Sequence, residues 1–83
     1  MTPLERVEAL YDSLLVHYGE GEDREIRASV KLLLVALDRL KRHAGPNWRQ
    51  LVNEYLDIAA NDPDKFELII SKNRTPQEDP PLS

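Results

Sequence analysis

The residues best suited to chemistry in this sequence are basic, and they gather in its middle third. Residues 26–50 hold six lysines and arginines against one acid, a net charge of +5, whereas residues 1–25 and 51–83 have net charges of −5 and −4. Guanidinium and ammonium groups bind phosphate and carboxylate oxygens, so this region can contact a nucleic acid or steer an acidic protein. The candidate partner-binding residues in it, called the basic cluster below, are Arg39, Lys41, Arg42, His43 and Arg49.

Nucleic-acid binding is one explanation for the basic cluster. Residues 44–47 predict a tight turn between two helices, which in outline is the arrangement of a helix-turn-helix. Asn47 and Gln50 would lie at the start of the second of these helices, within reach of base edges. The net charge of −4 and the pI of about 5.1 disfavour this explanation, because nucleic-acid-binding domains are usually basic.

Helix-end electrostatics is the other explanation. The dipole of a helix favours cations in its last turn and acids in its first turn, by about 0.3–1 kcal/mol for each charge. Residues 39–43 fall at the end of one predicted helix, and Glu5, Glu8 and Asp64 fall near the starts of two others. This explanation covers the acidic flanks as well as the basic centre, so we favour it. Under this explanation the basic cluster still forms one basic corner, at the joint between the two predicted helices. This corner suits an acidic protein partner or a second copy of the chain.

Catalytic and metal-binding groups are scarce. The absence of cysteine excludes disulfides, thiolate zinc sites and cysteine nucleophiles. His17 and His43 fall on different predicted helices, and no phosphate-binding glycine loop or nucleophile motif occurs. His17 and the acids of residues 20–23 offer metal ligands, but their spacing matches no metal loop and is typical of a solvated connection. We therefore expect no enzyme activity, no metal and no cofactor.

Glycines, prolines and capping residues mark the helix boundaries. Thr2 and Glu5 form a capping box at the start of a helix over residues 3–18, and Gly19 ends this helix. Asp23 is expected to cap a second helix over residues 24–43, which stops before Gly45. The sequence therefore predicts two helices joined by a short acidic loop.

The helix over residues 24–43 is apolar on two sides. Such a helix needs neighbours on both sides, so we expect it to lie at the centre of the fold with its main stripe buried. Leu32 and Val35, with Ala28, form the smaller group on the opposite side, and if exposed they add to the partner-binding surface. The main stripe consists of Ile26, Val30, Leu33, Leu37 and Leu40.

Two shorter helices complete the predicted fold. Asn47 is expected to cap a helix over residues 48–60, and Asp62 to cap one over residues 63–72. The fold class is therefore all-α, a compact bundle of four helices around the second one. The domain spans residues 1–73, and the proline-rich acidic segment 74–83 is expected to be a disordered tail. The apolar residues expected to bury the third helix are Trp48, Leu51, Val52, Tyr55, Leu56 and Ala59.

The function expected from these features is binding rather than catalysis. The N-terminus lacks the pattern of a signal peptide, and the longest apolar run, residues 32–37, is far below the ~20 residues that span a bilayer. We therefore expect a cytoplasmic protein. A small fold without catalytic residues acts by contact, which predicts a protein-interaction module (a small regulator, adaptor or inhibitor) that binds an acidic protein or forms a homodimer. The alternative is a nucleic-acid-binding regulator that uses the basic cluster.

Overall fold

The computed structural model describes residues 1–75, which form four α-helices and one 3₁₀ turn and contain no strand. The helices are α1 (Pro3–Tyr18), α2 (Arg24–His43), α3 (Trp48–Asn61) and α4 (Pro63–Arg74), with the turn η1 (Gly45–Asn47) between α2 and α3. The predicted all-α class and the four helices are confirmed. The tail was predicted to start at residue 74, which is the last residue of α4. The rest of the predicted tail, from residue 76 onward, lies outside the described residues. The predicted domain limits therefore stay a prediction.

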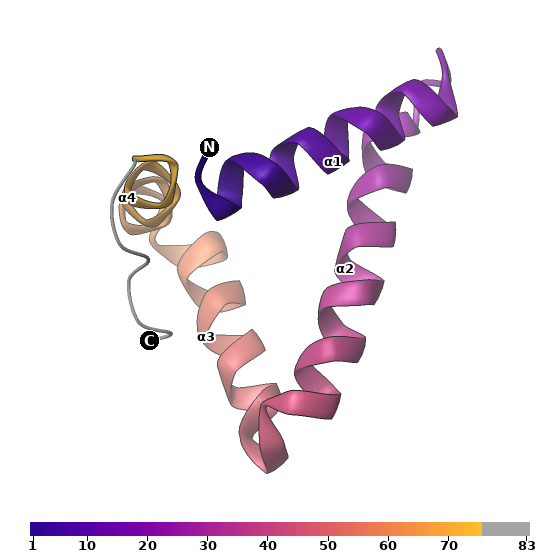
Figure 1. Cartoon of the computed structure of the whole chain (residues 1–83). Coiled ribbons are helices and arrows are strands. Elements are labelled where there is room, and N and C mark those ends of the chain that lie inside the picture. Colours follow the sequence, from indigo (N-terminus) through magenta and orange to yellow (C-terminus); the bar gives the residue numbers. More distant parts are fainter. Residues whose placement is uncertain (76–83) are drawn as a thin grey trace.

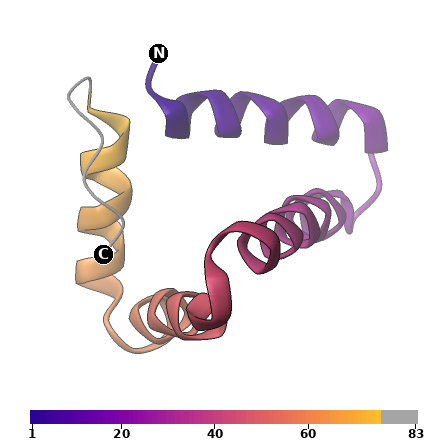
Figure 2. The ribbon, with the colours of Figure 1, turned by 60° about the horizontal axis from the view of Figure 1, so that its bottom comes forward.

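The helices follow one another around a ring. α1 meets α2 at one end, α2 and α3 diverge from η1 like the arms of a V, and α4 returns to the start of α1 (Figures 1 and 2). Each helix contacts its neighbours along the chain, and α4 also contacts α1. Within the described range the backbones of α1 and α3, and those of α2 and α4, make no close contact. The ring is therefore held together by the contacts between consecutive helices and between α4 and α1.

Three helix ends form as the sequence predicts. The amide of Thr2 donates to Oε1 of Glu5 at 2.8 Å, and the amide of Glu5 donates to Oγ1 of Thr2 at 3.3 Å, which completes the capping box. Gly19 ends α1 with a φ of 70°, a conformation that residues with a Cβ rarely adopt. Asp62 caps α4, because its Oδ1 accepts from the amide of Lys65 at 3.2 Å. These ends depend on local sequence alone.

Two other predicted caps have a different geometry. Asn47 and Asp23 occupy the positions before α3 and α2, but neither side chain makes a capping hydrogen bond. Their ψ angles of 12° and 13° explain the difference, since a capping side chain needs the extended backbone that these residues lack. The carboxylate of Asp23 instead pairs with Arg27 at 3.0 Å. The α2–α3 corner is made by the 3₁₀ turn, which Gly45 opens with a φ of 75°.

An ion pair closes the ring between α1 and α4. The guanidinium of Arg74 donates from Nε to Oε1 of Glu8 at 3.0 Å and from Nη2 to Oε2 at 2.8 Å. This hydrogen bonding lowers the pKa of the Glu8 carboxyl below its ordinary value. Both side chains are exposed, so the pair contributes more to the orientation of the two helices than to stability.

The described residues bury few side chains. Among them, Ala28 and Thr2 alone are less than a tenth exposed. Several large apolar side chains among the described residues are more than half exposed, including Ile26, Leu34 and Leu56. The ring therefore leaves apolar surface uncovered.

Candidate interaction surface

An apolar groove lies in the angle between α2 and α3. Its volume is about 290 Å³, and its lining is apolar throughout. It is positioned by η1, because the turn sends α3 back at an angle from the end of α2 so that the two apolar stripes line one opening (Figure 1). Phe66 on α4 also lines the groove. The residues of α2 and α3 used below to define this α2–α3 groove are Leu33, Leu37, Leu40, Val52, Tyr55 and Leu56.

Several large side chains of the α2–α3 groove are exposed. Leu33 is 53% exposed and Leu56 60% exposed, although both belong to stripes that we expected to be buried. That expectation is wrong for these residues and for Tyr55, because α2 and α3 diverge from their joint. Helical periodicity shows which side of a helix is apolar but not which element covers it. The sequence reasoning therefore assigned to the core residues that form an exposed apolar surface.

The apolar stripe of α2 continues as an exposed surface beyond the groove. Ile26 is 68% exposed and Val30 43% exposed, and both precede Leu33 on the same side of the helix. This part of α2 lies toward the α1 end of the helix, away from the joint with α3 (Figure 1). The uncovered apolar surface of α2 thus extends over several helical turns.

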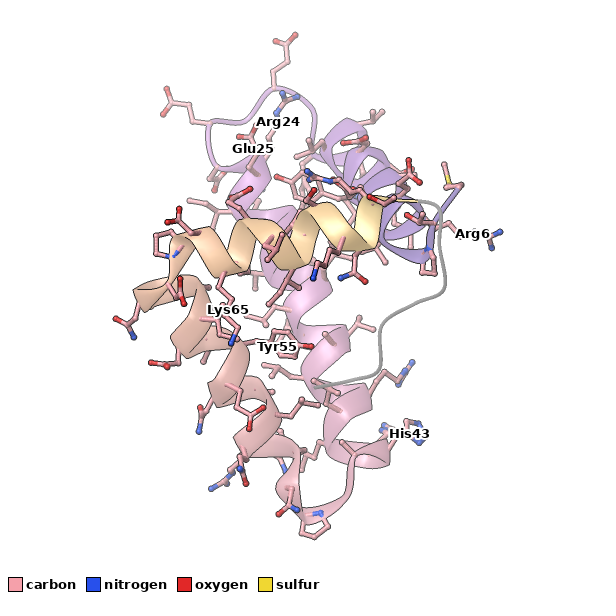
Figure 3. The ribbon with its side chains drawn as sticks, turned by 90° about the vertical axis from the view of Figure 1, so that its left-hand side faces the viewer. Arg6, Arg24, Glu25, His43, Tyr55 and Lys65 are labelled. Carbon is pink, nitrogen blue, oxygen red and sulfur yellow. The ribbon has the colours of Figure 1, made fainter. Side chains whose placement is uncertain are left out.

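The basic cluster lies at the joint of α2 and α3. Lys41, Arg42 and His43 form the last turn of α2, and Arg49 lies in the first turn of α3. Figure 3 shows His43 at the end of α2 opposite to Arg24. The structure therefore brings the predicted basic residues together at one exposed corner of the ring.

All three arginines of the basic cluster already have partners. Asp38 accepts from Nη1 of Arg39 at 2.7 Å and from Nε of Arg42 at 3.2 Å. The guanidinium carbon of Arg49 lies 5.6 Å from the centre of the Trp48 ring, a cation–π contact. These contacts are exposed and weak, so they orient the arginines without neutralising the corner.

The residues of the smaller apolar group on α2 differ in how deeply they are buried. Ala28 is fully buried in the part of α2 that meets α1, Leu32 is half-buried and Val35 is exposed. Helical spacing places Val35 on the side of α2 opposite to Leu33 and one turn before Arg39. Leu32 and Val35 therefore adjoin the basic cluster and lie outside the α2–α3 groove.

A second hollow lies between α3 and α4. Its volume is about 280 Å³, and charged side chains from both helices, among them Glu54, Asp57 and Lys65, line it together with Tyr55. Figure 3 shows Tyr55 on α3 and Lys65 on α4 on the same side of the molecule. No buried side-chain nitrogen or oxygen within residues 1–75 lacks a hydrogen-bond partner, so no buried unsatisfied polar group marks the hollow as a ligand site. In the same range, no group of three or more histidines and acids is placed to hold a metal ion.

Comparisons with known proteins supply no relative. No protein-family model, no curated protein and no solved structure matches this chain. None of the helices in the described part of the chain is both long and apolar enough to cross a membrane.

Proposed function

We propose that this chain is a non-catalytic protein-interaction module that binds its partner through the α2–α3 groove. The observation that supports this function is the exposure of Leu33, Tyr55 and Leu56 in a groove with an apolar lining. Extended apolar surfaces are rare on proteins that work as isolated monomers, and they mark contact sites for other macromolecules. Burial of these side chains supplies the affinity of such a contact.

The basic cluster has a secondary role in this proposal. Charges at the rim of an interface raise the association rate and select the partner more than they raise affinity. Lys41 and His43 make no ion pair with any described residue, and they therefore remain available to an acidic group on a partner. We do not extend the proposal to nucleic acids, because the chain has a net charge of −4 and no observation favours phosphate contact.

Site-specific photocrosslinking tests this function. Leu56 is replaced by a photoreactive phenylalanine analogue and the cells that produce the protein are irradiated. We expect one defined polypeptide to be attached, and the same adduct to form between purified components. Val16 on α1, which is 82% exposed but outside the groove, is the control position and should give no such adduct. Equal crosslinking from both positions, or none from Leu56, would contradict the proposal.

A further inference from the structure

We propose that the occupant of the α2–α3 groove is an amphipathic helix of a partner protein, with acidic side chains at the end that lies over the joint of α2 and α3. The inference rests on the proposed function, since it assumes that the groove is an interaction surface, and it names the chemistry of the partner. Three observations carry it: the spacing of the groove residues, the cations at the joint end of the groove, and the placement of the nearby acids.

The first observation is that the groove has the spacing and the lining of a site for a helix. Its residues are spaced by three and four positions on each helix: Leu33, Leu37 and Leu40 on α2, and Val52, Tyr55 and Ala59 on α3. Side chains of a third helix can pack between residues with this spacing as knobs into holes. Small-molecule sites also contain a few polar groups that orient the ligand, whereas the lining of this groove is apolar throughout.

The walls of the groove disfavour other ways of binding a peptide. A peptide that binds as a β-strand pairs with the exposed edge of a sheet, and residues 1–75 contain no strand. A proline-rich peptide needs a groove lined with aromatic rings, whereas the lining here is aliphatic apart from Tyr55 and Phe66. An amphipathic helix needs two apolar walls set at an angle, and α2 and α3 supply them where they diverge from η1 (Figure 1).

The second observation is that a cation ends each apolar row of the groove at the joint. Leu33, Leu37 and Lys41 follow one another along α2 in steps of four residues, so they lie on one side of that helix. On α3, Arg49 lies one turn before Val52 and on the same side. Both cations are exposed, and Lys41 makes no ion pair with any described residue. The joint end of the groove is therefore positive, whereas its walls are apolar.

The third observation is that the nearby acids lie where they do not neutralise these cations. Asp38 pairs with Arg39 and Arg42. The acids of α3, Glu54 and Asp57, line the hollow between α3 and α4, and no described acid lines the α2–α3 groove. A partner helix with carboxylates over the joint would meet opposite charge, whereas one with lysines there would meet like charge. Charge therefore selects an acidic helix.

Selection from a library of displayed helices tests this inference. Each member carries leucines at intervals of three and four residues, and the positions beside this leucine stripe at both ends are randomised between glutamate and lysine. The purified full chain is the bait. We expect the retained helices to carry several-fold more glutamate than lysine at one end of the stripe. Their binding should weaken as the salt concentration rises, because exposed charge pairs are screened.

Charge reversal identifies the residues responsible. Lys41→Glu combined with Arg49→Glu should reverse the bias, so that lysine replaces glutamate at the same end of the retained helices. The matched control combines Arg6→Glu on α1 with Lys31→Glu on α2. It changes the net charge equally, but Lys31 lies two residues before Leu33 and so falls outside the groove side of α2. The control should keep the bias of the native chain, and circular dichroism confirms that both double variants keep their helices.

The possible outcomes separate this inference from the proposed function. Retained helices without a charge bias, or a bias that the control pair changes as much as the Lys41 and Arg49 pair, would overturn the inference. A dimer of the chain alone that excludes the library helices would also overturn it, since a second copy would then occupy the groove. If Leu56 photocrosslinks to one polypeptide but the library shows no bias, this inference fails while the proposed function stands. If Leu56 gives no adduct and no library helix is retained, both fail.

Discussion

Truncation of Leu33 to alanine should weaken partner binding at the α2–α3 groove without a comparable effect on the fold of the chain. Leu33 is 53% exposed, and a partner in the groove would cover this fraction. The substitution removes three carbons, each worth about 0.8 kcal/mol when buried, so the loss at the interface is about 1.3 kcal/mol. This loss corresponds to a dissociation constant about nine-fold larger.

Isothermal titration calorimetry with the polypeptide that Leu56 photocrosslinks measures this constant for the native chain and for the variant. Leu68→Ala is the matched control, because Leu68 is also 53% exposed but lies on α4 outside the α2–α3 groove. Both substitutions remove the same buried fraction, so they should lower the melting temperature of the chain alike. Only Leu33→Ala should change the dissociation constant. Equal effects of the two variants on binding, or no effect of either, would refute the reasoning.

Three further predictions concern the fold and the basic cluster. Thr2→Ala removes the cap of α1 and should destabilise the protein by about 1 kcal/mol in chemical denaturation. The stabilising effect of the Glu8–Arg74 pair should be present at neutral pH and should be lost as the pH falls through the lowered pKa of the Glu8 carboxyl, because protonation breaks the pair. The difference in melting temperature between the native chain and Glu8→Gln should therefore be largest near neutral pH. In a mobility-shift assay at physiological salt, the chain should not bind random duplex or single-stranded nucleic acid.

Each of these predictions has a result that would contradict it. A Thr2→Ala variant as stable as the native chain would show that the capping box adds nothing to the fold. If the difference in melting temperature between the native chain and Glu8→Gln grew toward acidic pH, the Glu8 carboxylate would be unfavourable in the folded state. A mobility shift that falls steeply with salt and vanishes when Lys41 and Arg42 become glutamine would restore the nucleic-acid alternative.

The helix boundaries could be predicted because the signals that set them are local. Thr2 with Glu5, Gly19 and Asp62 with Pro63 act within a few residues of the ends that they define. The cap expected from Asn47 failed for an equally local reason, since the 3₁₀ turn leaves this residue with a ψ of 12° in place of the extended ψ that a cap needs. Residue type alone does not reveal the backbone conformation that decides whether a cap forms.

The arrangement of the helices could not be predicted in the same way. The Glu8–Arg74 pair joins residues 66 positions apart, and no local pattern indicates such a contact. The stripe that contains Leu33 was read correctly as apolar, but periodicity does not tell whether the covering helix belongs to the same chain. The groove could not be predicted from the sequence, because it depends on the angle between α2 and α3, which η1 sets.

The most direct test of the account is whether a protein partner contacts the α2–α3 groove. Photocrosslinking from position 56 reports this contact in the cells that produce the protein. The account predicts one defined adduct that forms from position 56 and not from the exposed Val16. No adduct from position 56, or equal adducts from both positions, would contradict the claim that the α2–α3 groove is an interaction surface.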